Sequence, residues 1–236
     1  MNLKNITPNM AKKNTSHFYS EMRLVEGFVS FLDNTRAGKF EIIPEMEAGF
    51  GRPDLILYTP PKFRTIRDID ALAKLNPRLS PLLSHTSSKT ITSLETLAKA
   101  AGVTHSSARQ IAKELTEISR LNYSKDMQVF ELDPIKVPPF SPLVSIEAKL
   151  NDWKRALVQA YRYLQFSNES WVLIDHAHCL NASKHINLFS SYGIGLASFS
   201  TNGQLYIHNR ARTIDWPNTP VAWRAQALLA RSFRFS

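Results

Sequence analysis

Two short apolar runs that carry charged residues lie far apart in the chain. The first starts at Asp54 and continues as Leu-Ile-Leu-Tyr, and the second contains Ile-Glu-Ala-Lys at 146–149. Short apolar runs bounded by turn residues predict buried β-strands. The 92 residues between Asp54 and Glu147 are far more than a turn between neighbouring strands requires. The sequence therefore predicts one α/β core that is interrupted by an inserted domain.

Proline clusters mark the two ends of that insert. Pro60 and Pro61 close the first run, and three prolines between 138 and 142 precede the second. Proline fixes φ and removes a backbone donor, so both clusters predict stiff joints outside secondary structure. We therefore divide the chain into a flexible N-terminus (1–14), a core (15–61 and 138–236) and an inserted domain (62–137).

Three charged side chains of the two runs are predicted to meet. Side chains of a strand alternate between its faces, so Glu147 and Lys149 share one side while their apolar neighbours face the core. Asp54 stands at the start of the other strand. Two carboxylates can hold a hard divalent cation through oxygen, which favours Mg²⁺ or Mn²⁺ over zinc. The alternative is that Glu147 and Lys149 form the wet face of a half-exposed strand.

The order of these residues resembles that of the PD-(D/E)XK nuclease superfamily. The matching parts are Gly-x-x-Asp at 51–54, Glu-x-Lys at 147–149 and Gln-Ala-x-x-Tyr at 159–163 on a following helix. The resemblance extends over residues 18–58 and 143–208. It implies an α/β fold with a restriction-endonuclease-like mixed central sheet flanked by helices. It also implies a Mg²⁺- or Mn²⁺-dependent deoxyribonuclease that acts as an endonuclease.

The same resemblance assigns roles to the site residues. Asp54 and Glu147 are expected to hold the metal, and an early helix is expected to add a carboxylate. Glu21 is placed best for that carboxylate. The alternatives are Glu26, Glu45 and Glu47.

Lys149, Gln159 and Tyr163 complete the expected catalytic set. Two neighbouring carboxylates should raise the pKa of Lys149 and keep it protonated, so we expect it to stabilise charge and position water rather than act as a base. Gln159 is expected to orient water or phosphate. For Gln159 and Tyr163 the alternative is a packing or supporting role.

The insert shows the pattern of two helices followed by a hairpin. Residues 93–102 predict a helix with a cap at Thr92 or Ser93, and Gly102 permits a tight turn into a second helix that runs to Arg120. Residues 122–132 predict a two-stranded wing. The helix predicted at 64–76 precedes them.

This segment resembles the winged helix-turn-helix domains of bacterial regulators, whose second helix contacts DNA. The residues expected to face DNA are His105, Ser106, Ser107, Arg109, Gln110 and Lys113. Arginine and glutamine can read base edges, whereas serine and lysine more often meet phosphates. The alternative is an ordinary solvated helix face.

The rest of the chain resumes an α/β pattern. We expect helices at 152–167, 180–190 and 219–231, a strand at 171–174, and a hairpin of 193–199 and 204–208. The segment Asp-His-Ala-His-Cys at 175–179 could suggest zinc. It lacks the usual paired spacing of zinc ligands, and His185 is its only evident fourth partner, so we interpret it as a strand-to-loop exit.

Composition narrows the class of protein. The formal net charge of +9 over 236 residues favours a polyanionic partner such as double-stranded DNA. Cys179 is the single cysteine, so no intrachain disulfide can form and a reducing cytoplasm is expected. No run approaches the ~18 apolar residues of a membrane span. Residues 1–14 hold no continuous apolar stretch, so we expect neither a signal peptide nor a membrane anchor.

Three functions fit these patterns. The first is a metal-dependent deoxyribonuclease docked on duplex DNA by its winged helix, and a homodimer is compatible with cleavage of both strands. The second is a non-catalytic DNA-binding regulator built on a nuclease-like scaffold. The third is an interaction module whose winged helix binds protein. The intact Asp, Glu and Lys set favours the first, and the positive charge argues against the third.

Overall fold

The chain is described by a computed structural model that covers most of its length. The described residues are 16–35, 40–47, 51–59, 66–76, 83, 90–117, 121–124, 129–132, 135 and 137–235. The flexible N-terminus predicted at 1–14 lies outside them. Two compact units are formed: unit 1 combines Met1–Pro60 with Ser141–Pro217, and unit 2 combines Pro61–Phe140 with Asn218–Ser236. Among the described residues, no helix has the length and apolar character needed to cross a membrane.

Unit 1 is built on a six-stranded mixed sheet in the order β1-β2-β6-β7-β8-β9. Its elements are α1 (Glu21–Thr35), β1 (Glu41–Pro44), β2 (Leu55–Tyr58), β6 (Leu143–Lys149), α5 (Trp153–Tyr163), β7 (Glu169–Asp175), the 3-10 helix η3 (His176–His178), α6 (Leu180–Ser183), α7 (Ile186–Tyr192), β8 (Gly195–Phe199) and β9 (Leu205–Asn209). The central pairs β6–β7 and β7–β8 are parallel, and the outer pairs are antiparallel. The predicted α/β class with a mixed, helix-flanked sheet is confirmed.

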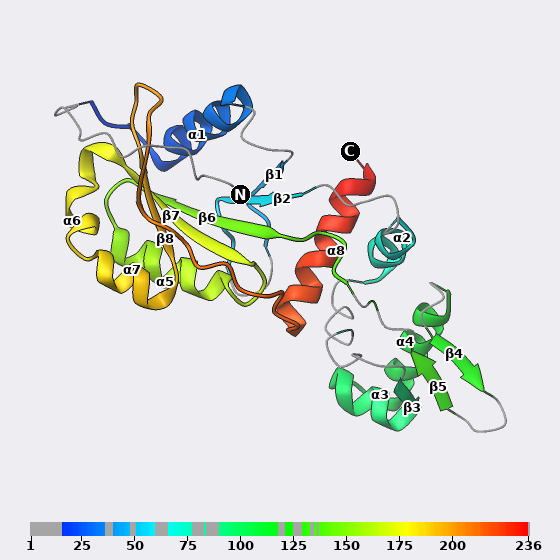
Figure 1. The fold of residues 1–236 in the computed structure, drawn as a ribbon. Coiled ribbons are helices and arrows are strands. Elements are labelled where there is room, and N and C mark those ends of the chain that lie inside the picture. The colour runs from blue at the N-terminus through cyan, green and yellow to red at the C-terminus, as the bar shows by residue number, and fades with distance from the viewer. Residues whose placement is uncertain are drawn as a thin grey trace. The chain divides into compact units, whose positions relative to one another are not determined.

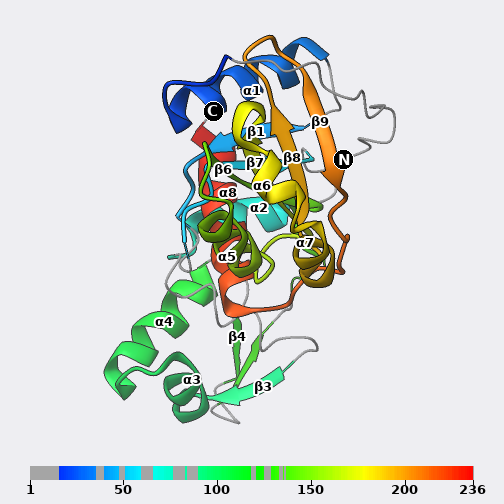
Figure 2. The same cartoon turned by 90° about the vertical axis from the view of Figure 1, so that its left-hand side faces the viewer.

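Helices cover both faces of this sheet (Figures 1 and 2). Helix α1 packs Leu24, Phe28 and Leu32 against one face, because residues four apart share a side of a helix. Helices α5 and α7 cover the opposite face through an apolar cluster that includes Trp153 and Phe189. The sheet is thus buried on both sides, as its parallel centre requires.

Strand β6 carries Glu147 and Lys149 in the middle of the sheet. Every residue of β6 is buried, and Glu147 and Lys149 are only 1% and 9% exposed. Ile146 and Ala148 pack in the cluster beneath α1, which leaves Glu147 and Lys149 to the other side, as the alternation predicts. The interpretation of Glu147 and Lys149 as the wet face of a half-exposed strand is therefore wrong.

Two predicted helices of unit 1 differ in detail from those observed. Helix α5 ends at Tyr163 rather than at 167, because Leu164 N bonds to Tyr161 O at 3.3 Å and tightens the last turn. The helix predicted at 180–190 is split into α6 and α7. His185 separates them with φ −111° and ψ 26°, outside helical values. The hairpin of β8 and β9 forms as predicted, with Gly203 N donating to Ser200 O at 2.9 Å in its turn.

Unit 2 holds two helical pairs and a small sheet. Its elements are α2 (Ile66–Lys74), β3 (Thr90–Ser93), α3 (Leu94–Ala101), α4 (His105–Glu117), β4 (Leu121–Ser124), β5 (Val129–Leu132) and α8 (Pro220–Phe235). The strands pair antiparallel in the order β3-β5-β4. Ser93 caps α3 by accepting from Thr96 N, and Gly102 ends it with φ 63°, a left-handed value that favours glycine. The winged helix-turn-helix interpretation stays a prediction.

Helix α8 groups with the insert, although the sequence division placed 138–236 in the core. Gln226 is fully buried, and its side chain accepts from Phe140 N at 3.0 Å and donates to Phe140 O at 2.7 Å. Arg231 donates to the carbonyls of Ala73 and Leu75 at the end of α2, both at 3.1 Å. These polar contacts join α8 to α2 and to the chain that returns from the insert.

Candidate active site

Asp54 and the end of β6 are brought together by strand pairing. In the antiparallel β2–β6 pair, Leu55 lies opposite Ile146, so the residue before Leu55 falls beside Glu147. The Asp54 Oδ2 atom accepts a 2.7 Å hydrogen bond from Ala148 N. The backbone of the Glu-x-Lys segment therefore fixes the position of the Asp54 carboxylate.

Lys149 is the hub of the cluster. Its Nζ lies 2.9 Å from Glu147 Oε1 and 3.1 Å from Glu21 Oε2, and it donates to Ala148 O at 2.9 Å. These three contacts employ all three protons of the ammonium. The Lys149 side chain is 11% exposed, whereas that of Glu21 is 46% exposed. Glu21 is thus the partner that solvent or a ligand reaches most easily.

Tyr163 and Gln159 support Glu147 from helix α5. The Tyr163 hydroxyl donates to Glu147 Oε2 at 2.7 Å, and Tyr163 is only 1% exposed. Gln159 lies near enough to Tyr163 to act against the rise in the pKa of its hydroxyl. Its Oε1 atom is buried and has no hydrogen-bond partner among the described residues. A buried acceptor of this kind calls for a donor such as a bound water.

Gly51 allows the segment before Asp54 to pass close to the Tyr163 ring. A Cβ atom at position 51 would lie 2.9 Å from Tyr163 Cε1, closer than carbon atoms normally approach. The φ of Gly51 is 134°, which other residues rarely adopt. Both constraints explain why the Gly-x-x-Asp segment begins with glycine.

The cluster is electrostatically strained. Burial raises the pKa of Asp54 despite the opposing Ala148 hydrogen bond and Lys149 charge. Burial likewise raises the pKa of Glu147, against the hydrogen bonds from Tyr163 and Lys149. Burial acts to lower the pKa of Lys149, but the hydrogen bond and charge of Glu147 raise it above its ordinary value. The pKa of Tyr163 is raised by burial and by Glu147, so its hydroxyl stays a donor.

Charge balance shows what this cluster lacks. The carboxylates of Glu21, Asp54 and Glu147 surround the single ammonium of Lys149, which leaves two negative charges in excess. A divalent cation would balance them, and carboxylate oxygens are the donors that Mg²⁺ and Mn²⁺ prefer. Each carboxylate oxygen can accept two bonds, so Glu147 retains acceptor capacity beyond Lys149 and Tyr163. The donor set fits a hard divalent cation.

The structure distinguishes the four glutamates considered for the early carboxylate. Glu21, at the start of α1, contacts Lys149. Glu26 instead pairs with Arg23 at 2.8 Å, and Glu45 lies 3.6 Å from Arg52. Glu47 is exposed. Both Glu45 and Glu47 follow β1, which ends at Pro44, rather than lying on it. The Glu45 charge contributes to the raised pKa of Asp54, and its backbone N donates to Asp54 O at 3.2 Å.

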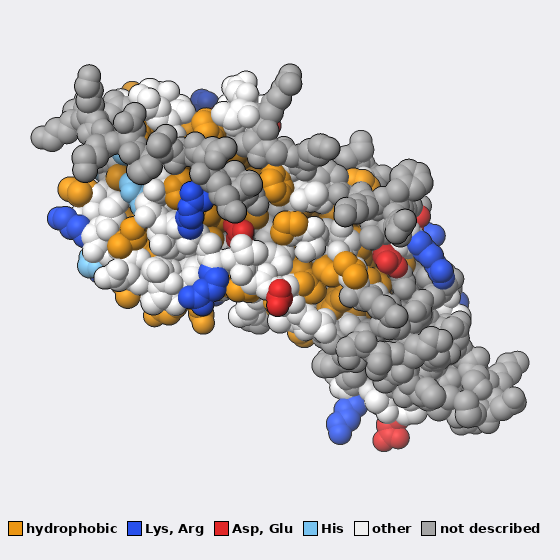
Figure 3. Space-filling model, viewed as in Figure 1, with side chains coloured by type: hydrophobic (Ala, Val, Ile, Leu, Met, Phe, Trp, Pro, Cys, Tyr) orange, Lys and Arg blue, Asp and Glu red, His pale blue; other side chains and the backbone are white. Residues whose placement is uncertain are grey.

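The residues expected to face DNA share one helix of unit 2. Helix α4 buries Ala108, Ile111 and Ala112, and its opposite side is open to solvent. The exposed residues include His105, Ser106, Ser107, Arg109, Gln110 and Lys113. Ser106 and Ser107 bond to the Thr104 hydroxyl at 3.0 Å, and Gln110 donates to Glu114 at 3.4 Å. On the face drawn in Figure 3, the lysines and arginines of the described residues are scattered singly.

No protein-family model, curated protein or solved structure matches the chain. Function is therefore inferred from the residues and their geometry. The sequence predicted one site from six residues, and the structure brings them together: Glu21, Asp54, Glu147, Lys149, Gln159 and Tyr163. The sequence did not predict that the Ala148 backbone amide would bind the Asp54 carboxylate, because strand alternation does not show which amide a carboxylate will contact.

Proposed function

We propose that this protein is a metal-dependent deoxyribonuclease that hydrolyses phosphodiester bonds. The observation that carries the proposal is the convergence of Asp54, Glu147 and Lys149, with Glu21 on the same ammonium, in a cluster that has two uncompensated negative charges. A purely structural ion pair needs one carboxylate for each ammonium. An excess of buried carboxylate at one point is costly unless a cation completes it.

Asp54 and Glu147 would hold the divalent ion. Such an ion, when bound, lowers the pKa of a coordinated water and neutralises charge on the phosphate. The raised pKa of Lys149 keeps its ammonium charged, which suits stabilisation of a phosphate oxyanion rather than proton abstraction. Because Glu21 is the most exposed partner of Lys149, a phosphate oxygen can take its place on the ammonium.

Helix α5 supplies the supporting contacts. The Tyr163 hydroxyl holds one oxygen of Glu147, which orients the carboxylate. The buried Oε1 of Gln159, which has no partner among the described residues, can accept a hydrogen bond from a water molecule and so orient it. Gln159 and Tyr163 would therefore act through Glu147 and through water.

The inserted winged helix-turn-helix would dock the enzyme on double-stranded DNA. The support is that α4 presents Arg109 and Lys113 four residues apart on its exposed side, where they can reach one groove. Unit 2 provides this face, whereas unit 1 provides the carboxylate cluster. A cytoplasmic location and a homodimer belong to the same proposal.

The test is cleavage of supercoiled and linear DNA with Mg²⁺, with Mn²⁺ and with chelator. We expect metal-dependent products from the wild-type chain. The matched control is Glu26→Gln, a carboxylate on the same helix as Glu21 that pairs with Arg23 instead of Lys149. Wild-type protein that binds duplex DNA without cutting it under any of these metals would exclude the nuclease.

One observation favours a second candidate, the non-catalytic DNA-binding regulator on a nuclease-like scaffold. All three Lys149 protons are already bonded within the protein, which describes a closed cluster. In a regulator, Asp54→Asn and Glu147→Gln would leave DNA affinity and all other activity unchanged. In a nuclease, the same variants would bind DNA and fail to cut it.

A further inference from the structure

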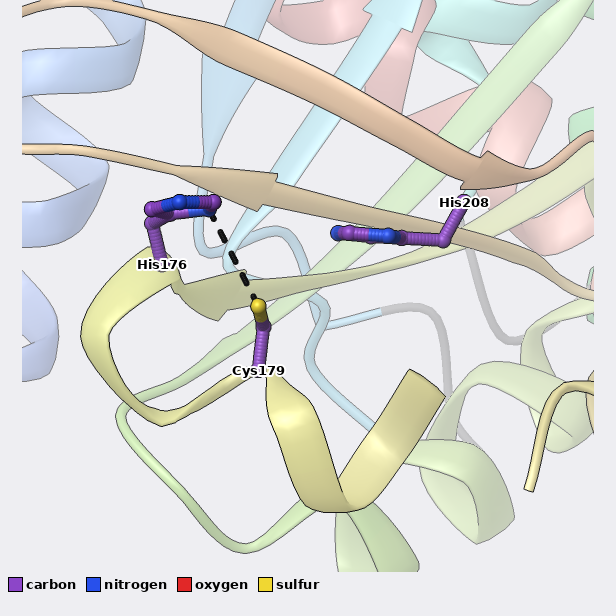
Figure 4. A group of neighbouring side chains, drawn as sticks. All are labelled: His176, Cys179 and His208. Atoms are coloured by element: carbon purple, nitrogen blue, oxygen red, sulfur yellow. Dashed lines mark hydrogen bonds between the residues drawn. The ribbon is translucent and has the colours of Figure 1, made fainter. Parts of the chain in front are cut away.

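A second polar cluster of unit 1 shares no residue with the carboxylate cluster. His176 lies in η3 directly after β7, Cys179 precedes α6, and His208 lies on β9. One ligand atom of each residue can be chosen so that all three lie within 4.8 Å of one another. Figure 4 shows the three side chains turned toward a common space. The sequence had offered His185 as the fourth partner of this segment, but His185 stacks on Trp153.

Neighbouring side chains hold the two imidazoles in place. The Ser198 hydroxyl, on β8, lies 2.9 Å from His176 Nδ1 and 2.8 Å from His208 Nε2. The His176 ring stacks on Tyr206 with centroids 4.1 Å apart. Ser183 Oγ lies 3.5 Å from His208 Nδ1. The Tyr206 and Ser183 contacts are of the kind that orients the rings of metal-binding histidines, and the Ser198 hydroxyl lies between the two rings.

The donor set is nitrogen and sulfur, without a carboxylate. Cys179 Sγ lies 3.8 Å from His176 Nδ1, and Cys179 is 9% exposed. The neighbouring Asp175 is fully buried and turned to other partners, since its carboxylate accepts from Phe18 N at 3.0 Å and Ala177 N at 3.1 Å. Imidazole and thiolate select zinc and similar transition metals over Mg²⁺.

We propose that His176, Cys179 and His208 form a zinc-binding site. Zinc bonds of ~2.0–2.1 Å to nitrogen and ~2.3 Å to sulfur require the three ligand atoms to draw closer, which side-chain rotation can supply. On binding, the Cys179 thiol releases its proton to solvent and each imidazole donates a neutral lone pair. Water or the Ser198 hydroxyl fills the fourth position.

The site joins segments that are distant in sequence. Cys179 and His208 are separated by 28 residues, and the metal ties the exit of β7 to the edge strand β9. The exit is otherwise held by the two hydrogen bonds that Asp175 accepts. A structural role, in which zinc fixes the loop after β7, follows from this placement.

Cobalt titration of the full chain tests the site. The protein is stripped with chelator, dialysed, and titrated with Co²⁺ in excess Mg²⁺, so that the carboxylate cluster is occupied by the hard ion. Cys179 is the only cysteine, so any thiolate-to-cobalt charge-transfer band arises from it. We expect one equivalent of Co²⁺ to produce this band and zinc to displace it.

Substitutions decide whether the three residues act together. His176→Gln and His208→Gln should each weaken cobalt affinity by more than the ~10–100-fold typical for loss of an outer contact. His178→Gln, an exposed neighbour on the same turn, should leave the titration unchanged. Circular dichroism of the metal-free variants checks that they fold.

Two results would overturn the zinc site. One is a wild-type chain with no charge-transfer band, which would reduce the cluster to a His-Ser-His hydrogen-bond network. The other is a band that survives His208→Gln with unchanged affinity. If one histidine variant fails to fold, the other carries the same comparison.

Discussion

The two polar clusters of unit 1 lie on one row of the sheet and differ in nearly every chemical respect. Strand register places Lys149 beside Ile174 and Ile174 beside Ser198, so the strand positions of Lys149 and Ser198 are two strand spacings apart, ~10 Å. One is rich in carboxylate, whereas the other offers a thiol and two imidazoles, and burial lowers the pKa of both imidazoles. One sheet can thus select two ions by donor type alone.

The separation also assigns different roles. Two metal ions that share one phosphate lie ~3.5–4 Å apart, far less than the strand spacings that separate these clusters. The buried side chain of Ile174 stands between them. We therefore assign the proposed chemistry to the carboxylate cluster and the proposed structural ion to the His/Cys/His cluster.

The largest expected effect is that of Glu147→Gln, which should change the carboxylate cluster and leave the His/Cys/His cluster intact. Glu147→Gln should lower metal-dependent cleavage by ~10²–10³-fold or more, because a single electrostatic contributor is commonly worth that much. The cobalt band of Cys179 should remain. Initial rates on plasmid DNA and the cobalt titration are measured on the same preparation, with Glu26→Gln as control. Loss of both readouts together would mean that the clusters are not independent.

DNA docking should matter to the first cluster and not to the second. Arg109→Ala should weaken duplex affinity by ~1–3 kcal/mol and relax preference at one base pair if Arg109 reads guanine. Lys113→Ala should weaken all duplexes alike and lower the salt slope by roughly one. Fluorescence anisotropy at several salt concentrations gives both numbers. Two unchanged curves would point to unit 2 as a protein-binding module.

Tyr163 offers a stability comparison. Tyr163→Phe removes the donor to buried Glu147 and should destabilise the fold by ~1–3 kcal/mol, the cost of an unsatisfied buried acceptor. Tyr206→Phe is the matched control, since its ring stacks on His176 while its hydroxyl bonds to Gln204 at an exposed position. Urea unfolding of both variants measures the difference. Equal losses would show that Glu147 does not depend on the Tyr163 hydroxyl.

The smallest effect concerns Asp54 and pH. Because the pKa of Asp54 is raised from 3.8, its favourable contribution is present below that value and is lost as pH rises through the folded pKa. Asp54→Asn mimics the protonated group, so it should stabilise the metal-free protein at neutral pH and have little effect near pH 4. Thermal unfolding of Asp54→Asn in chelator is compared with that of Asp33→Asn, a control at an exposed position of α1. If Asp54→Asn instead destabilised the metal-free protein at neutral pH, the predicted direction of the effect would be wrong.

The sequence pattern was sufficient to predict the site residues that lie on or next to strands, because strand alternation decides which side chains share a face. Asp54 at the start of one strand and the shared face of Glu147 and Lys149 on another predicted that the three charges meet, and the antiparallel β2–β6 pairing is how the structure brings them together. The sequence preferred Glu21 but left three other glutamates open, and the packing of α1 on the sheet decides between them. No spacing in the sequence encodes that packing.

The sequence did not predict the His/Cys/His cluster or the grouping of α8 with the insert, and the reason is related. His208 reaches Ser198 only because β9 returns beside β8, with an irregular register at Leu196, so local ligand spacing could not identify it. Helix α8 follows the core in sequence, yet its buried Gln226 bonds to Phe140. Both His208 and α8 are placed by contacts between segments that are distant in sequence, and local sequence patterns do not predict such contacts.

The interleaving of the two units along the chain sets an order for their completion during synthesis. Strands β1 and β2 emerge before the insert, yet their neighbour β6 begins only at Leu143. Helix α8, which unit 2 needs to cover α2, emerges after β9. On the ribosome, the sheet of unit 1 can therefore close while the apolar side of α2, with Ile69 and Leu72, still awaits its cover. A growing chain holds two unfinished units at once, and the one begun second is completed last.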